Sequence, residues 1–454
     1  MSGPLKIGNA QGFWGDSIDA PARLVSQVPD LDYLTLDYLA EVSLSIMAIQ
    51  QHRDPDAGYA RDFIGVVQSL IPHWQEGHRV KIVTNAGGLD PLKCAEAVAQ
   101  VLRDGGCTGK KIGIVTGDNV IPVIENTFGE ETKVFTNWEN SLPISVIKDE
   151  LVTANAYIGA DTAAEVLAQG ADIVLAGRMA DPSMTVAPAM HHFGWSADEY
   201  DKLAGATIAG HVLECGSQAC GGISTHWLEL PDLVHLAFPY VELEEDGSFV
   251  VTIPEGAGGT VTEGIVKEQL LYELGDPGNY VSPDCHVSFL ELKVEQVGEN
   301  RVRVSNAVGS APPPTYKVSA TYQDGFTASG QLTIYGHDAV AKARKSGEII
   351  LERLKEAGYT YKRTNIECLG AGACVNHSKD EPELVETVLR ISVADPDKKA
   401  IQRFSKELAV LACGGAQGTT GYAAGRPRVS PVFGYWPCLV ERDKLNMESQ
   451  IITA

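Results

Sequence analysis

The chain has 454 residues, a formal net charge of −23 at pH 7, and hydrophobic residues at 44% of its length. This length exceeds one ordinary core and predicts about two or three domains, and the hydrophobic content argues against wholesale disorder. Nucleic acid and anionic membranes would both repel a chain of this charge, so we expect neither as a partner.

Alternating strand and helix patterns fill the amino-terminal half. Buried-strand patterns are expected at residues 5–8, 33–36, 80–84, 111–115 and 171–176. Helical patterns separate them, at residues 17–28, 41–51, 59–76, 91–102 and 161–169. Strands with few charges between amphipathic helices are typical of a mostly parallel sheet covered on both faces. We therefore predict an α/β fold with a doubly wound sheet over residues 1–225.

The pattern changes in the carboxyl-terminal half. A hairpin turn is expected at Asp246-Gly247, and a helix at residues 263–273 follows it, so we interpret residues 226–285 as a connecting region. Beyond it, strand patterns are expected at residues 288–294, 301–304 and 384–393, and helical patterns at residues 339–357 and 398–409. We predict an α+β domain over residues 286–454.

Targeting and cysteine patterns favour a cytoplasmic protein. The amino terminus enters a strand without the apolar run of a signal peptide, and no stretch has the apolar length needed to cross a bilayer. The nine cysteines are irregularly spaced, which is typical of reduced thiols. Cys215 and Cys220 lack the tight, matched pairs of a zinc site, so we predict no metal ligands there.

The expected parallel strands end in polar, glycine-rich loops. These loops cover residues 8–17, 84–91, 115–119 and 177–183. Because the carboxyl ends of parallel strands share one edge of a sheet, we expect the loops to gather around one ligand crevice. Tight turns alone are the alternative explanation for each glycine. The loops contain neither a Gly-x-Gly-x-x-Gly fingerprint nor a phosphate loop, which disfavours a typical dinucleotide dehydrogenase or ATPase.

Four residues are candidates for chemistry at this crevice. A carboxylate at Glu214, in an apolar and glycine-lined pocket, would have a raised pKa and could serve as an acid or base. Cys215 is either a nucleophile or an ordinary buried thiol. His211 is either a proton carrier or a core histidine, and Asp181 is either catalytic or a helix cap before Pro182.

A second set of residues is predicted to bind substrate. Arg178 could hold a carboxylate or phosphate bidentately, or could form a local ion pair with Asp181. Residues 254–262 lead into a helix and form either an anion cradle or a plain threonine-capped start. The predicted substrate-binding residues are Asp16, Asn85, Gly87, Gly88, Arg178, Gln218, Gly258, Gly259 and Thr260.

Taken in order, these segments resemble the acyclic terpene utilization protein A family. The matching pieces are residues 12–17, 84–91, 155–160, 170–178, 193–195, 209–218, 258–262 and 268–273. The resemblance spans nearly the whole chain and implies a bacterial-type cytosolic protein in the catabolism of branched or terpenoid acyl compounds. Such proteins are often encoded beside acyl-CoA carboxylase and hydratase genes. Cys220 departs from the family's pattern, which argues against a metal or redox pair with Cys215.

Three hypotheses of function follow. The leading one is a catabolic enzyme that acts on a branched or terpenoid-type carboxylate or acyl-CoA by acid/base chemistry of the hydratase or lyase kind, with Glu214 as acid/base and Arg178 as anchor. The second is a non-catalytic partner or regulator of an acyl-CoA carboxylase. The third is a metal-assisted lyase that uses Asp16, Asp118, Asp181 and Glu214 around a hard cation.

Beyond that divalent metal, no cofactor is predicted. We also expect a homo-oligomer, at least a dimer, with the aromatic segment at residues 432–437 at or beside the contact. The alternative is that these aromatic residues fold against the chain's own core.

Overall fold

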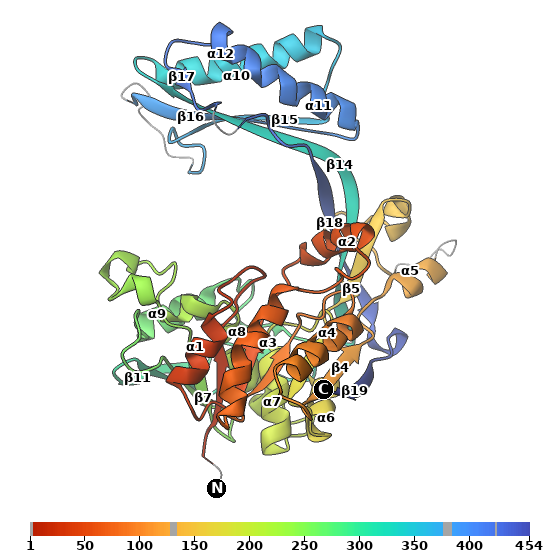
Figure 1. The fold of residues 1–454 in the computed structure, drawn as a ribbon, viewed down its shortest axis with the longest axis vertical. Coiled ribbons are helices and arrows are strands. Elements are labelled where there is room, and N and C mark those ends of the chain that lie inside the picture. The colour runs from red at the N-terminus through yellow and green to blue at the C-terminus, as the bar shows by residue number, and fades with distance from the viewer. Residues whose placement is uncertain (1–2, 128–133, 376–383, 423–424) are drawn as a thin grey trace. The chain divides into compact units, whose positions relative to one another are not determined.

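A computed structural model describes residues 3–127, 134–375, 384–422 and 425–454 (Figure 1). The chain divides into two compact units: unit 1 consists of Met1–Thr321 with Tyr435–Ala454, and unit 2 consists of Tyr322–Gly434. Both units combine helices with sheets, and the large sheet of unit 1 is mixed, so the α/β class is confirmed. No helix in the described ranges has the length and apolar character needed to span a membrane.

Five parallel strands form the centre of the large sheet in unit 1. In spatial order they are β1 (Leu5–Asn9), β2 (Tyr33–Leu36), β3 (Lys81–Thr84), β6 (Ile173–Ala176) and β4 (Lys111–Thr116). All residues of β2, β6 and the inner part of β4 are buried, which agrees with the charge-poor strand patterns expected from the sequence.

Antiparallel strands extend this sheet at both edges, so the sheet as a whole is mixed rather than mostly parallel. Beside β1 lie β7 (Tyr240–Leu243), β8 (Phe249–Thr252), β12 (Arg301–Ser305) and β11 (Lys293–Gly298), and beside β4 lies β19 (Glu448–Thr453). The expected turn at Asp246 and Gly247 joins β7 to β8, and the positive φ of +84° at Gly247 explains why glycine stands there.

Helices cover both faces of the parallel strands. On one face, α1 (Ala20–Gln27), α3 (Asp62–Gln75) and α4 (Pro91–Asp104) share a core with Ile112 and Ile114 of β4. Gly113 points to the other face, against Val166 of α6 (Asp161–Ala168), because side chains alternate along a strand. On that second face α6 contacts α7 (Ser183–Phe193), and α7 contacts α8 (Tyr200–Glu214).

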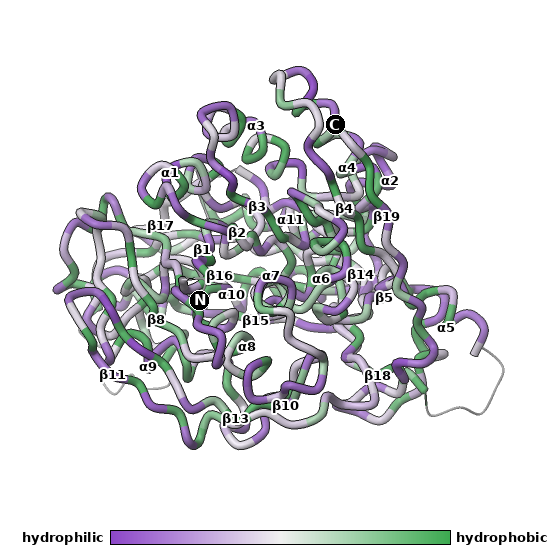
Figure 2. The backbone as a smooth tube through the Cα atoms, turned by 90° about the horizontal axis from the view of Figure 1, so that it is seen from below, coloured by the Kyte–Doolittle hydropathy of each residue, from purple (hydrophilic) through white to green (hydrophobic). Residues whose placement is uncertain are grey.

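Helix α3 shows how the sequence pattern produces this packing. Its buried residues recur at helical spacing and form the stripe Phe63, Val66, Val67, Leu70, Ile71 and Trp74. Figure 2 shows hydrophobic residues along this helix and hydrophilic residues along the neighbouring loops.

Unit 1 also contains helices and strands outside the large sheet and the helices named above. They are the helices α2 (Ser43–Arg53), α5 (Ile121–Thr127) and α9 (Glu263–Leu271), and the strands β5 (Leu151–Ala156), β9 (Tyr280–Val281), β10 (His286–Ser288) and β13 (Val308–Ser310). The last three form a small antiparallel sheet in the order β13-β10-β9.

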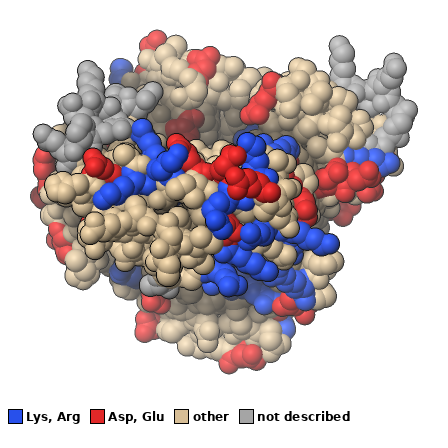
Figure 3. Space-filling model, turned by 90° about the horizontal axis from the view of Figure 1, so that it is seen from above, with Lys and Arg blue, Asp and Glu red and all other residues tan. Residues whose placement is uncertain are grey.

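Unit 2 is an antiparallel sheet with helices packed on it. The strand order is β15 (Arg363–Leu369), β16 (Glu386–Asp395), β14 (Thr315–Tyr335) and β17 (Thr419–Thr420), and β18 (Ser430–Glu441) also pairs with β14. The helices are α10 (Ala339–Glu356), α11 (Lys398–Glu407) and α12 (Leu411–Gly414). Leu354, Ile391 and Phe404 lie in its core. Lys and Arg side chains gather on the face that carries α10 and α11 (Figure 3).

The aromatic segment expected at an oligomer contact forms part of β18. Within it, Trp436 is 2% exposed and its indole Nε1 donates a hydrogen bond of 3.0 Å to the carbonyl of Phe135. This tryptophan therefore packs inside its own chain, as the core alternative predicts. The oligomeric state itself stays a prediction.

Candidate functional site

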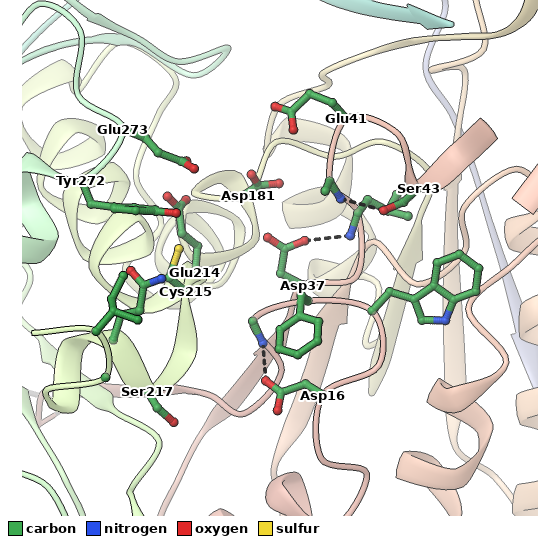
Figure 4. Close-up of a pocket in the computed structure, with 18 of the residues that line it drawn as sticks. Asp16, Asp37, Glu41, Ser43, Asp181, Glu214, Cys215, Ser217, Tyr272 and Glu273 are labelled. Carbon is green, nitrogen blue, oxygen red and sulfur yellow. Dashed lines mark hydrogen bonds between the residues drawn. The ribbon is translucent and has the colours of Figure 1, made fainter. Parts of the chain in front are cut away.

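Loops at the carboxyl ends of the parallel strands surround a cavity of about 700 Å³ in unit 1. The loops after β1, β2 and β6 each contribute to its wall. The end of α8, the segment that follows it at residues 215–223, and residues 272–273 complete the wall. A second cavity of about 450 Å³ adjoins it. Both cavities are lined by Glu41, Asp181, Glu214 and Glu273. The close-up in Figure 4 shows these carboxylates, from separate segments, around one open space.

Seven predicted site residues line these cavities. The first is lined by Asp16, Arg178, Asp181, Glu214, Cys215 and Gln218, and the second by His211 together with Asp181 and Glu214. Asp16 is held within its own loop, because its carboxylate accepts hydrogen bonds from the amides of Gly12 (3.1 Å) and Ser17 (2.7 Å).

Three predicted residues of the loop after β3 lie outside both cavities. Asn85 is fully buried: its Nδ2 donates to Oδ1 of Asp37 at 2.7 Å, and its Oδ1 accepts from the amide of Tyr38 at 2.8 Å. A Cβ on Gly87 would lie 2.6 Å from the carbonyl oxygen of Ala176. Asn85 is therefore a positioning residue for Asp37, and Gly87 lets the loop approach β6 closely.

Gly88 has a similar packing role. Its φ is +55°, and a Cβ there would lie 2.5 Å from the sulfur of Met47. Both the backbone conformation and the lack of space therefore require glycine.

The loop before α9 also lies outside both cavities. A Cβ on Gly258 would collide with the carbonyl of Asp232, and Gly259 has a φ of +82°. Thr260 donates from Oγ1 to Oδ1 of Asn300 at 2.8 Å. The start of α9 is capped by Thr262, whose hydroxyl accepts from the amide of Ile265 at 3.2 Å. The start of α9 therefore has the threonine cap that the sequence offered as one alternative, and the anion cradle stays a prediction.

Arg178 is fixed by a buried network after β6. Its side chain is 2% exposed, its Nη1 donates to Oδ1 of Asp181 at 2.7 Å, and its guanidinium carbon lies 4.0 Å from the ring centroid of Tyr157. Its backbone amide donates to Asp118 at 2.8 Å, and Asp118 also accepts from Asn155 at 2.7 Å. The local ion pair is thus formed, and Asp181 makes no side-chain cap to α7. Nε of Arg178 is buried and has no hydrogen-bond partner among the described contacts.

Asp37, which is not among the site residues predicted from the sequence, lies beside this network. Its carboxylate accepts from the amide of Leu39 at 3.1 Å and from Asn85. Burial raises its pKa well above the ordinary value, the charge of Asp181 raises it further, and Arg178 opposes both effects. The sequence does carry one signal, because Asp37 directly follows the buried strand β2.

His211 and Glu214 form a buried pair in the last turn of α8. Their spacing of three residues places both on one helix face, and Nδ1 of His211 lies 2.9 Å from Oε1 of Glu214. Burial raises the pKa of Glu214 to about 6, although His211 partly opposes the shift. Burial lowers the pKa of His211, but the carboxylate outweighs it, so the pKa is raised. Nε2 of His211 is buried without a described partner.

Cys215 lines the first cavity as a thiol. Burial raises its pKa well above the ordinary value, and the charge of Glu214 raises it further. A thiol that holds its proton so tightly is a poor nucleophile at neutral pH. Cys220 is fully buried and lines neither cavity.

The first cavity combines a carboxylate-rich interior with apolar side chains. Its acidic lining residues are Asp16, Asp37, Glu41, Asp181, Glu214 and Glu273, and Arg178 is the one cation among its described lining residues. Its apolar lining residues include Phe13, Leu39, Ile46 and Ile223, of which Phe13 is 59% and Ile223 71% exposed. Such a site can accommodate a hydrocarbon chain next to groups that exchange protons.

A comparison with protein families gives one match over almost the entire chain. The family model described as "Acyclic terpene utilisation family protein AtuA" matches residues 5–451. No curated protein matches the sequence.

Proposed function

We propose that this chain is an enzyme that works by acid/base catalysis. The chain belongs to the acyclic terpene utilisation family AtuA and so has a role in acyclic terpene utilisation. The reaction is proton transfer next to the carbonyl of a branched, acyclic acyl compound, as in hydration, dehydration or a related lyase step. Glu214 takes up and returns the proton, and His211 orients it.

The observation that carries this proposal is the buried pair of Glu214, which lines both cavities, and His211, which lines the second. A carboxyl group with a pKa of about 6 is populated in both protonation states near neutral pH. Such a group is a better proton carrier than an exposed glutamate, because general acid/base catalysis is most effective when the pKa lies near the operating pH.

The apolar side chains support a hydrocarbon substrate. Phe13 and Ile223 are largely exposed although they line a cavity, and burying them against a branched chain would remove apolar surface from water. The acyl chain would therefore lie along Phe13, Ile46 and Ile223, with its carbonyl carbon toward Glu214.

The charges favour a thioester over a free carboxylate as the reacting group. Arg178 is already paired with Asp181, and the other ionisable lining residues of the first cavity include Asp37, Glu41 and Glu273. A free carboxylate beside Glu214 would meet uncompensated negative charge, whereas a thioester carbonyl is neutral. An acyl-CoA fits this requirement, with its nucleotide portion outside the cavity.

Exchange of the substrate's α-protons with solvent deuterium tests the proposal. Thioesters of branched acyclic acids, saturated and α,β-unsaturated, are incubated with the full chain in deuterated buffer and followed by proton NMR. We expect exchange or hydration with the unchanged protein and a loss of at least about 100-fold for Glu214→Gln. Glu229→Gln is the matched control, because Glu229 also neighbours a histidine three residues away but is 78% exposed.

Equal rates for both variants would contradict the assignment of Glu214. A protein without turnover that co-purifies with an acyl-CoA carboxylase would instead favour the non-catalytic alternative. The metal-assisted alternative has less support, because Asp118 lines neither cavity and bonds to Arg178 and Asn155 instead.

A further inference from the structure

Three metal-ligating side chains meet at the end of α3, away from the site described above. One ligand atom each from His73, Glu76 and His78 lies within 4.8 Å of the other two. Across the described ranges, no other group of three His, Cys, Asp or Glu residues comes so close. None of the three residues lines either cavity.

The helix end explains why these side chains meet. Gly77 has a φ of +102°, its amide donates to the carbonyl of Trp74 at 3.2 Å, and the amide of His78 donates to the carbonyl of His73 at 3.0 Å. These two hydrogen bonds define a Schellman motif, which folds the chain back over the last helical turn. The imidazole centroids of His73 and His78 are consequently 5.4 Å apart, and Glu76 lies between them in sequence.

The position favours a cation. The last carbonyl groups of a helix carry partial negative charge, which attracts positive charge to this end. Nδ1 of His73 is buried and has no hydrogen-bond partner among the described contacts. A buried polar atom without a partner costs free energy, and coordination to a metal ion would satisfy it.

We propose that His73, Glu76 and His78 bind one zinc ion, with water as a fourth ligand. Two imidazoles and one carboxylate form a borderline ligand set that suits zinc, whereas magnesium and calcium prefer oxygen ligands throughout. Zinc–ligand bonds of about 2.0–2.2 Å require the three atoms to move slightly closer. The exposed Glu76 side chain can make this movement.

Zinc at this position would join the end of α3 to the segment that leads into β3. The folded chain holds the three ligands close together, so zinc would bind the folded state more tightly than the unfolded state and stabilise it by mass action. The site is therefore structural or regulatory, and it is independent of the acid/base chemistry proposed for Glu214.

Equilibrium dialysis of the full, untagged chain against zinc tests this inference. The exposed thiols of Cys374 and Cys413 are alkylated first, because they also bind zinc. We expect one zinc ion per chain, no uptake of magnesium, and a melting temperature that rises with zinc. The paired substitutions His73→Gln and His78→Gln should weaken zinc binding by at least about 10–100-fold. Removal of a residue that only hydrogen-bonds to a metal ligand typically costs this much, and these substitutions remove ligands themselves.

His226→Gln is the matched control, since His226 forms a surface pair with Glu229 (3.3 Å) that has no second histidine. It should bind zinc as the unchanged protein does. If the paired histidine variant does not fold, Glu76→Gln tests the zinc site instead, because Glu76 is exposed and its substitution should leave the fold intact. This variant should also weaken zinc binding. Zinc uptake that is absent in the unchanged chain, or undiminished in these variants, would overturn the proposal.

Discussion

The carboxyl group of Glu214 lies 2.9 Å from Nδ1 of His211, and both side chains are buried in the last turn of α8. Glu214 faces both cavities, while His211 contributes to the wall of the second. Ionised Glu214 raises the proton affinity of His211, and protonated His211 lowers that of Glu214, so the two groups titrate as a pair. This pair links the fold to the chemistry proposed for it.

The pH dependence of turnover should report Glu214. If Glu214 acts as the base, kcat/KM rises as the carboxyl group loses its proton through a pH of about 6. We expect this acidic limb in the unchanged enzyme and its loss in Glu214→Gln, measured by initial rates across a pH series. Glu214→Asp should retain the limb with reduced kcat. A limb that persists in the glutamine variant would assign it to another group.

Loss of Arg178 should destabilise unit 1. Arg178→Met leaves Asp181 without its partner beside the buried Asp37, and breaking such a pair costs about 3 kcal/mol of unfolding free energy. Arg301→Met removes an ion pair with Glu242 at a more exposed position and should cost about 1 kcal/mol or less. Urea denaturation of both variants measures the difference. Similar losses would show that the Arg178 network contributes no more than a surface pair.

Asp284 should make the protein less stable as pH rises. Burial raises the pKa of Asp284 to about 6, despite hydrogen bonds from the Ser183 hydroxyl (2.5 Å) and the Ala160 amide (2.7 Å). The pKa of Asp284 is higher in the folded state than in the unfolded state, so the protonated carboxyl group favours folding. Its contribution to the unfolding free energy is complete below about pH 4 and is lost as pH rises through about 6.

Asp284→Asn does not titrate and therefore removes this dependence. Relative to the variant, the unchanged protein should lose on the order of 2 kcal/mol of unfolding free energy between about pH 4 and pH 7. Denaturation at several pH values measures it. A difference that is constant with pH would contradict the raised pKa.

Gly87→Ala should affect stability rather than substrate binding. The added methyl group would press on the Ala176 carbonyl at 2.6 Å, and overpacking of this kind costs about 1–3 kcal/mol. KM should change little, because Gly87 lines neither cavity. Gly275→Ala is the control, since nothing lies within 4 Å of a Cβ there. A raised KM with unchanged melting temperature would instead favour the ligand-binding role expected from the sequence.

The protein should form at least a homodimer. Large α/β enzymes commonly close twofold interfaces, and this expectation does not depend on Trp436, which is buried in its own chain. Light scattering at micromolar concentration measures the mass. A value of 48.6 kDa at every concentration would show a monomer and contradict the prediction.

The sequence by itself determined the elements with strong local patterns. The helix predicted at residues 339–357 is α10 (Ala339–Glu356), and the strand predicted at residues 384–393 is β16 (Glu386–Asp395). The placement of Arg178 and Asp181 at the crevice also followed from local rules, since both follow β6 and the loops after parallel strands share one edge. These features depend on the periodicity of hydrophobic residues and on the residues next to each helix or strand. Both can be seen directly in a sequence.

Only the tertiary structure decided the features that join distant segments. The pairing of β19 with β4 and the contact of Asn85 with Asp37 link residues far apart in the chain. Strands β14 and β18 each contribute residues to both units, although nothing in their composition marks the boundary. Burial also set the raised pKa of Glu214 and Asp284. Desolvation depends on which segments cover a side chain, and no local pattern encodes that.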